Sequence, residues 1–209
     1  MPITIKIPLA KRIFDILVAG TILTLISPIW ILILILIFIE HTLRGHPLDP
    51  LFYKETRMSK GQPFTLYKFN IFDQRVIEDL RKNDIFIHTK KLEHTGKLIL
   101  IGKILRQIYL DELPQLLNVL RGDMSLVGPR PLNIEVYANL KSENRTQAKI
   151  PAGITGLFQS YKGKDQKTSM ELDAEYFRHF STKSGLWIVA FDILILLRTV
   201  KVVLRARGI

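Results

Sequence analysis

The stretch Ile16–Ile39 reads "ILVAGTILTLISPIWILILILIFI" and contains no formally charged residue among its 24 positions. Roughly 20 apolar residues suffice to cross the hydrocarbon core of a bilayer as an α-helix. The run is too long for the apolar region of a cleavable signal peptide, and no small-residue cleavage site follows it. A helix buried in a protein core is the alternative, but such helices seldom run this long without a polar face. The stretch therefore predicts a helix that enters a membrane.

Ser27 and Pro28 lie in the middle of this run. Proline has no N–H, and its ring clashes with the carbonyl four residues earlier, which is that of Thr24. The hydroxyl of Ser27 or of Thr24 can bond to nearby backbone groups in lipid. Positive residues, which favour the cytoplasm, flank both ends of the run: Lys6, Lys11 and Arg12 before it, and Arg44, Lys54, Arg57 and Lys60 after it. We predict a helix-break-helix that enters one leaflet and returns. A straight span with a short external tail is the alternative.

The composition restricts the partners of the chain. It has 209 residues, no cysteine, and 30 Lys+Arg against 19 Asp+Glu, which gives a formal net charge of +11. The absence of cysteine excludes disulfides, zinc thiolate sites and a cysteine nucleophile. The positive charge indicates an anionic partner, and nucleic acid, anionic lipid headgroups and phosphorylated substrates all qualify.

The remaining chain reads as a mixture of short elements. Residues 41–60 are polar and turn-rich and predict a connection, and residues 73–97 are too mixed to assign beyond helix and loop. The other expected elements are a strand over Pro63–Phe69, a helix with a leucine stripe from Leu110 to Leu120 that Gly122 ends, a strand from Met124 running into a rigid turn, a glycine-punctuated loop or strand over Pro151–Gln159, and a helix over residues 169–180.

The last segment, from Trp187 to the C-terminus, is again strongly apolar. Its cations Arg198, Lys201 and Arg205 fall within about 60° of one another on a helical wheel at ~3.6 residues per turn. A basic stripe beside an apolar face predicts a helix lying in the membrane interface. A second span is less favourable because these cations would have to enter hydrocarbon.

The motif "LDELPQ", Leu110–Gln115, places two carboxylates side by side just before an apolar helix. Asp111 and Glu112 are ordinary residues for a helix N-terminus, so a capping role without chemistry is one reading. The other reading is catalytic. A carboxylate can attack phosphorus, and Mg²⁺ typically takes one or two protein carboxylates. Arg106, and Arg130 between two prolines, then qualify as clamps for phosphate oxygens.

These residues belong to a longer pattern. The segment "LRQIYLDELPQLLNVLRGDMSLVGPRP" (Leu105–Pro131), together with "KRIFDILVAG", the Ser27-Pro28 pair, "PFTLYKF", "GITGLFQ" and the stretch from Asp192 to Thr199, resembles the bacterial sugar transferases, the small monotopic phosphoglycosyl transferases. The resemblance covers nearly the whole chain.

The resemblance implies an activity. Members of this family move a sugar 1-phosphate from a nucleotide diphosphate sugar, usually a UDP-sugar, to a polyprenyl phosphate such as undecaprenyl phosphate, and UMP leaves. The family mechanism is ping-pong through a covalent intermediate. The enzymes work at the cytoplasmic face of the bacterial inner membrane and begin the assembly of lipopolysaccharide, exopolysaccharide and related glycans.

The resemblance also assigns roles to residues of this chain. Asp111 would be the nucleophile, and Glu112 the second catalytic residue and the ligand of Mg²⁺. Arg106, Arg130 and Lys68 would bind phosphate, Pro129 and Pro131 would shape the nucleotide pocket, and Ser27 and Pro28 would set the membrane break. One departure concerns phosphate binding, because Asn70 stands where the family usually has arginine. The others are Ala152, Ser59 and an insertion at residues 182–185.

Together these observations predict an α/β, mostly α-helical, membrane-associated single domain with interfacial amphipathic helices and a few short strands. Residues 1–40 would form the re-entrant membrane helix, 41–186 the cytosolic catalytic domain, and 187–209 the basic interfacial helix. We expect a UDP-sugar, undecaprenyl phosphate and membrane lipids as partners and no nucleic acid. A homodimer is left open. A membrane-anchored basic protein without catalysis, and a membrane-tethered nucleic-acid binder, are the competing hypotheses.

Overall fold

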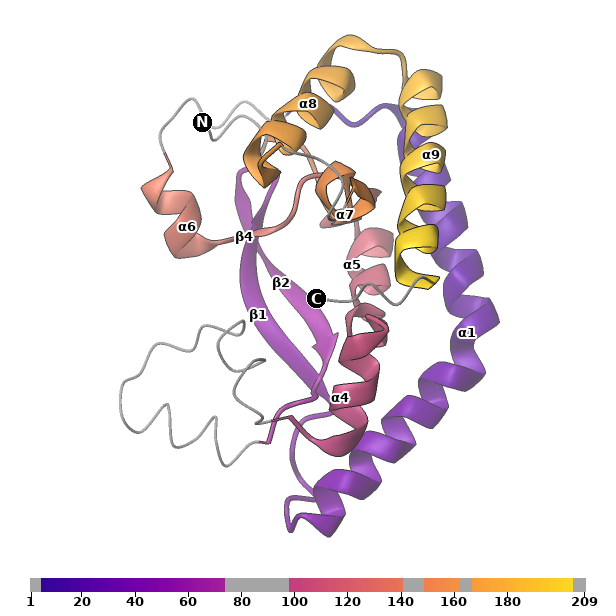
Figure 1. Cartoon of the computed structure of the whole chain (residues 1–209), viewed down its shortest axis with the longest axis vertical. Helices are drawn as coiled ribbons and strands as arrows, with labels where there is room; N and C mark the ends of the chain where they lie inside the picture. The colour runs from indigo at the N-terminus through magenta and orange to yellow at the C-terminus, as the bar shows by residue number, and fades with distance from the viewer. Residues whose placement is uncertain (1–4, 74–97, 141–148, 162–166, 205–209) are drawn as a thin grey trace. The chain divides into compact units, whose positions relative to one another are not determined.

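The computed structural model describes residues 5–73, 98–140, 149–161 and 167–204. They form a mostly helical domain with a few short strands and one long apolar helix near the N-terminus, as the sequence predicts. Figure 1 shows the whole chain, and its contacts divide it into two compact units. The described residues of the first unit fall within Met1–Leu25, Lys54–Tyr67 and Pro114–Arg207, and those of the second within Ile26–Tyr53 and Lys68–Leu113.

The N-terminal helix α1 spans Leu9–Leu43 and is long and apolar enough to cross a membrane. Only 11% of its most apolar window is buried, so the described chain does not enclose it as a core helix. The structure differs from the predicted helix-break-helix, because α1 is one helix with Pro28 inside it. A proline removes one donor, and the neighbouring turns keep their bonds. The Thr24 hydroxyl donates to the carbonyl oxygen of Gly20 at 3.0 Å. A re-entrant path in the membrane stays a prediction.

Short strands form two small sheets. Strands β1 (Phe52–Ser59) and β2 (Gln62–Phe69) are neighbours, and β1 pairs antiparallel with β4 (Leu132–Asn133) through Arg57↔Asn133 and Met58↔Leu132. The predicted strand over Pro63–Phe69 is therefore confirmed. The prediction of a simple connection over residues 41–60 is wrong, because β1 forms there; the polar residues of β1 alternate with half-buried ones in a pattern too weak to detect in the sequence.

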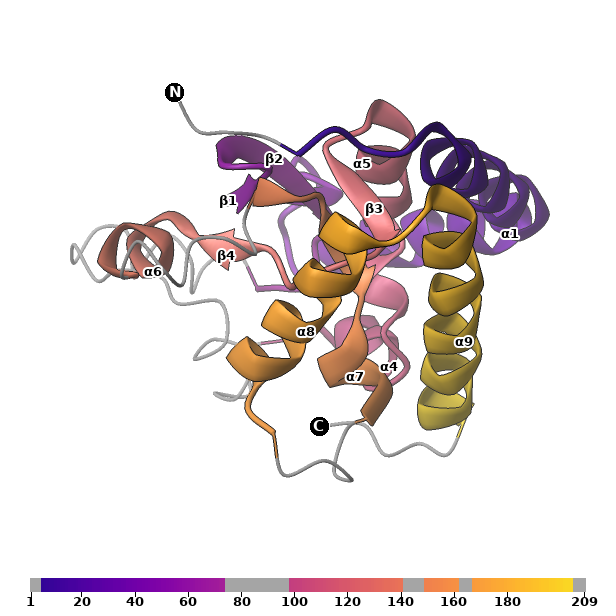
Figure 2. The same ribbon diagram turned by 90° about the horizontal axis from the view of Figure 1, so that it is seen from above.

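The first unit is built around the parallel pair of strands β3 (Met124–Val127) and β5 (Ala152–Thr155), which align Met124 with Ala152 and Val127 with Thr155. Figure 2 shows the helices of this unit from above. They are α5 (Gln115–Arg121), α6 (Ile134–Asn139), α7 (Leu157–Tyr161), α8 (Ser169–Thr182) and α9 (Gly185–Leu204). The helix predicted over residues 169–180 is confirmed as α8, whose N-terminus has a capping box made by Thr168 and Glu171.

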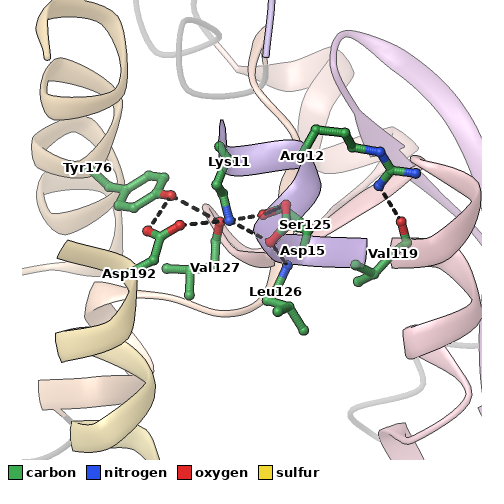
Figure 3. Close-up of polar contacts among 9 residues, drawn as sticks. All are labelled: Lys11, Arg12, Asp15, Val119, Ser125, Leu126, Val127, Tyr176 and Asp192. Carbon is green, nitrogen blue, oxygen red and sulfur yellow. Dashed lines mark hydrogen bonds and ion pairs between the residues drawn. The ribbon is translucent and has the colours of Figure 1, made fainter. Parts of the chain in front are cut away.

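A buried ionic cluster joins the beginning of α1 to this unit (Figure 3). The Lys11 ammonium lies 2.7 Å from Asp15 Oδ1 and 2.7 Å from Asp192 Oδ2 of α9, and all three side chains are almost fully buried. The Ser125 hydroxyl donates to Asp15 at 2.8 Å, and the Tyr176 hydroxyl donates to Asp192 at 2.8 Å. Lys11 is therefore an internal ion-pair partner.

Arg12 is also held inside the protein. Its guanidinium donates to the carbonyl oxygens of Val119 at 2.6 Å and Leu120 at 2.7 Å, near the end of α5. These carbonyls belong to the last turn of α5, and that of Val119 also accepts from the Gly122 N–H at 3.0 Å. The fold therefore uses both cations to anchor α1, and their effect on the orientation of the helix in a membrane stays a prediction.

The second unit has its own apolar core. Helix α4 (Leu100–Gln107) contributes Leu105, the second half of α1 contributes Ile33 and Ile37, and the end of β2 contributes Phe69. The Trp30 ring packs edge-on against Phe69, with ring centroids 5.4 Å apart. The second half of α1 therefore shares a core with α4, the helix that precedes Asp111 and Glu112 in the sequence.

Candidate active site

The acidic pair lies at a sharp change of chain direction after α4. Tyr109 has a left-handed backbone with φ 59°, which is uncommon for a non-glycine residue. The 3₁₀ helix η1 (Leu110–Glu112) follows directly and contains Asp111 and Glu112. Backbone strain of this kind is often retained where a site requires a fixed geometry.

The capping role for Asp111 is wrong. Helix α5 begins at Gln115 with Pro114 as its N-cap, and no side-chain cap hydrogen bond is present there. Asp111 lies within η1 and is 4% exposed. A carboxylate is costly to bury, so its position requires compensating cations or hydrogen bonds.

Lys68, at the end of β2, supplies such a cation within the same unit. Its ammonium lies 2.7 Å from Glu112 Oε1 and 3.9 Å from Asp111 Oδ2. The side chain of Asp111 is 5% exposed, whereas that of Glu112 is 23% exposed. The geometry thus divides the pair into a buried carboxylate and a more accessible one, with one lysine beside both.

Arg106 is in the last turn of α4, five positions before Asp111, and is partly buried. The Tyr109 N–H donates to the Arg106 carbonyl oxygen at 3.2 Å, which closes the turn between α4 and η1. Arg106 and the acidic pair are therefore carried by consecutive turns of one short segment.

The pair has the donor chemistry of a magnesium site. Mg²⁺ usually takes one or two carboxylates and fills its other positions with water and phosphate oxygens. Within the described residues no group of three or more His, Cys, Asp or Glu side chains could hold a metal ion. A site made of two carboxylates fits the residues present. The Lys68 ammonium lies beside the same two carboxylates, which shows that their position favours a positive charge.

Arg130 belongs to the first unit, in the turn after β3. The Gly128 N–H donates to the Thr155 carbonyl oxygen at 2.9 Å, and the Gly153 N–H donates to the Pro129 carbonyl oxygen at 2.8 Å. A Cβ atom at Gly128 or at Gly153 would collide with the opposite backbone, so this approach requires glycine on both sides. The turn is therefore tightly held, with Pro129 buried, Pro131 partly buried and the Arg130 side chain exposed.

Asp173 of α8 lies next to this turn, and the sequence analysis did not identify it as a site residue. It lines a small cavity with Pro129 and Arg130 and is 6% exposed. Burial raises the pKa of Asp173 to about 7, against the lowering effects of the Arg130 charge and of the hydrogen bond that the Arg130 backbone N–H donates to it. The signal that could have found it is an acid on the buried face of α8, which also presents Leu172, Tyr176 and Phe180.

We expect Asp173→Asn to change how stability depends on pH. A carboxyl whose pKa is higher in the folded than in the unfolded protein binds more protons when folded, so its contribution to stability falls as pH rises from about 4 to about 7. The slope from one proton is at most about 1.4 kcal/mol per pH unit. The neutral amide removes this loss and keeps an acceptor for the Arg130 N–H. Chemical unfolding of both proteins at pH 5 and pH 8 would measure it.

The wild type should lose stability relative to the Asn variant over that interval. The carboxyl of Asp192, whose pKa burial raises to about 6, is common to both proteins and cancels in the comparison. If the free energy of unfolding changes equally with pH in the two proteins, the raised pKa of Asp173 is contradicted.

Asn70, which replaces an expected arginine, has a structural role. Its side-chain amide donates to the Pro50 carbonyl oxygen at 2.7 Å, and its backbone N–H donates to the Leu51 carbonyl oxygen at 2.9 Å. The residue is fully buried. It fixes the chain that enters β1, and Lys68, two positions earlier, lies near the acidic pair.

Comparisons with known proteins identify the family of the chain. Residues 7–206 match the family model described as bacterial sugar transferase. The exopolysaccharide production protein ExoY of Rhizobium meliloti is 32% identical over 211 aligned positions that cover 96% of this chain and 88% of ExoY.

Longer relatives match as well. The undecaprenyl-phosphate galactose phosphotransferase of Salmonella typhimurium is 34% identical, with 95% of this chain and 41% of that protein covered. The UDP-glucose:undecaprenyl-phosphate glucose-1-phosphate transferase of Escherichia coli is also 34% identical, with 92% and 39% covered. The chain thus spans less than half the length of these two relatives. On the family match and its coverage of ExoY, the chain belongs to the bacterial sugar transferase family.

Proposed function

We propose that the chain transfers a hexose 1-phosphate from a UDP-sugar to undecaprenyl phosphate and releases UMP. The observation that carries the proposal is the buried Asp111 carboxylate beside Glu112 and Lys68. The names of the Salmonella and Escherichia relatives, which specify undecaprenyl phosphate with galactose or glucose, support the same class of reaction.

The proposed chemistry has two displacements at phosphorus. In the first, an Asp111 carboxylate oxygen attacks the sugar-bearing phosphorus of the UDP-sugar, the phosphoanhydride bond to UMP breaks, and UMP leaves with the electron pair. In the second, a phosphate oxygen of undecaprenyl phosphate attacks the same phosphorus, and the bond to Asp111 breaks. The carboxylate is restored, and the product is undecaprenyl diphosphate sugar.

The surrounding residues would lower the cost of bringing two anions together. Lys68 and Arg106 would neutralise charge on the phosphate oxygens next to Asp111. Arg130, in the rigid turn of the first unit, would bind phosphate through its planar fork, as the family resemblance implies. Glu112 would hold Mg²⁺, which when bound supplies charge stabilisation for the transferring phosphoryl group. Pro129 and Pro131 would give the nucleotide pocket its shape.

Helix α9 supports a site at the membrane surface. Its buried face includes Asp192 and Ile195, whereas another face exposes an apolar stripe that consists of Leu186, Ile193, Leu197, Val200 and Leu204. Arg198 and Lys201 lie beside this stripe, and Arg198 also donates to the Tyr161 hydroxyl at 2.6 Å; Arg205 lies outside the described residues. Cations near an anionic leaflet each contribute about 1 kcal/mol to binding. We infer an interfacial helix at the cytoplasmic face of the bacterial cell membrane.

A transfer assay tests the proposal. The protein in nanodiscs is given UDP-[¹⁴C]glucose or UDP-[¹⁴C]galactose with undecaprenyl phosphate and Mg²⁺, and label is followed into the lipid phase while UMP is measured in the water phase. We expect equal amounts of the two products with at least one donor. Label in the lipid phase without UMP, or no transfer with any UDP-hexose, would contradict the reaction.

We expect Pro28→Ala to change the path of α1 in the membrane. The chain lacks cysteine, so Ile5→Cys gives a unique label site in the wild-type and alanine backgrounds. If Pro28, and not the contacts of Lys11 and Arg12 that anchor the start of α1, sets a re-entrant path, an impermeant maleimide reaches the thiol only from the cytoplasmic side in the first background and from outside in the second. A thiol that is cytoplasmic in both backgrounds would show that Pro28 does not set the path. External labelling with Pro28 in place would show that the helix spans the membrane.

A further inference from the structure

The beginning of α4 is capped by a residue from the end of α1. Ile99, the residue before the helix, provides no side-chain cap hydrogen bond. The first N–H groups of a helix have no intrahelical acceptor and need one from elsewhere. Glu40 Oε1 accepts from the Leu100 N–H at 2.6 Å, and Glu40 Oε2 accepts from the Ile101 N–H at 2.9 Å.

Arg44, one turn later on α1, fixes the orientation of the Glu40 carboxylate. Its Nη2 and Nε atoms lie 2.8 Å and 3.1 Å from Glu40 Oε1, and its Nη1 atom donates to Asp73 Oδ2 at 3.0 Å. The carboxylate therefore faces α4 with both oxygens engaged. Its negative charge at a helix N-terminus is also favourable to the helix dipole.

Helix α4 has little freedom to absorb a shift at its first turn. It is eight residues long, and a Cβ atom at Gly102 would lie 2.7 Å from both the Cβ atom and the carbonyl oxygen of Ile71. Arg106 lies in its last turn, and Tyr109 and η1 follow within three residues. A displacement of the first turn would thus reach Arg106 and Asp111 through one packed segment.

We propose that Glu40 is a positioning residue for the transfer reaction. It is the first charged residue after the uncharged run of α1, and it fixes the start of the segment that carries Arg106 and the acidic pair. The end of the membrane helix thereby sets the place of the reacting groups. The expected effect of Glu40 on kcat rests on the proposed function. The capping contact between Glu40 and α4 does not depend on that function.

The experiment compares wild type with Glu40→Ala, Glu40→Gln and Glu135→Ala in nanodiscs. Glu135 is the matched control, because it is an exposed acid in the first turn of another helix, α6. Loss of an N-cap raises the equilibrium constant for opening the first helical turn by a factor of about five to ten. We expect Glu40→Ala to lower kcat about five- to tenfold with KM for the UDP-sugar changed less than twofold. Glutamine keeps one acceptor oxygen and should recover part of the rate.

Hydrogen exchange supplies a readout that needs no activity. In Glu40→Ala the amides of residues 100–103 should exchange at least about fivefold faster, while those of α8 keep the wild-type rate. Faster exchange in α8 as well would identify a general loss of stability and overturn the local role. Wild-type exchange at residues 100–103, or unchanged kcat in an active enzyme, would also overturn it. An inactive wild type with the local exchange change would instead reject the proposed reaction and keep the cap.

Discussion

Asp111→Asn should abolish sugar-phosphate transfer, with kcat reduced by about three orders of magnitude or more, the range seen when an enzyme loses its covalent nucleophile. The amide has nearly the same shape as the carboxylate, but it is not a competent nucleophile toward phosphorus. Asp111 is 4% exposed, so the replacement also removes a buried charge and should leave the protein folded. The transfer assay measures the rate, and thermal unfolding in nanodiscs measures the fold.

Two control experiments test whether the loss of activity is due to the missing nucleophile. Glu175→Gln removes another carboxylate that is paired with a lysine, Lys167, in a solvent-exposed position, and it should transfer at the wild-type rate. Without acceptor, the wild type should gain the mass of one hexose phosphate and the Asn variant should not. Substantial transfer by Asp111→Asn would exclude the covalent route and leave direct attack by the lipid phosphate.

The sequence predicts the parts of the fold that depend on local pattern. The apolar helix, the strand that ends at Phe69 and the helix that ends at Gly122 follow from periodicity and turn chemistry, and Gly122 indeed adopts a left-handed φ of 88°. Strand β1 was not predicted, although it neighbours β2 across the short turn at Lys60 and Gly61, where both residues have a positive φ.

For the candidate site, too, the sequence predicts the residues but not what surrounds them in the fold. The adjacent acids are visible in the sequence, but their surroundings are not. Asp111 resembles a helix cap until the structure begins α5 at Gln115, and Asp173 resembles any acid of an amphipathic helix until its burial is known. Lys11 and Asp192 lie near opposite ends of the chain, so no local pattern indicates that they are ion-pair partners.

Lys11→Met should strongly destabilise the first unit. It leaves two carboxylates, Asp15 and Asp192, buried without their shared cation. Removing one partner of a buried ion pair costs about 3–5 kcal/mol, because the remaining charge stays desolvated. Chemical unfolding in detergent micelles measures the change. Lys6→Met, which removes an exposed cation five residues earlier, should change stability by no more than about 0.5 kcal/mol.

A triple variant separates the cost of unpaired charge from the loss of packing. Lys11→Met combined with Asp15→Asn and Asp192→Asn leaves no buried charge, and its amides can still accept from Ser125 and Tyr176. Replacement of a whole buried ionic group by neutral residues is often close to neutral in stability. The triple variant should therefore recover at least half of what Lys11→Met loses. If it is as unstable as Lys11→Met, the methionine is a poor fit in the cavity and the charges are not the cause. If Lys11→Met itself costs less than about 1 kcal/mol, water reaches the cluster and α1 is anchored by its other contacts, of which the two hydrogen bonds from Arg12 to the end of α5 are the most direct.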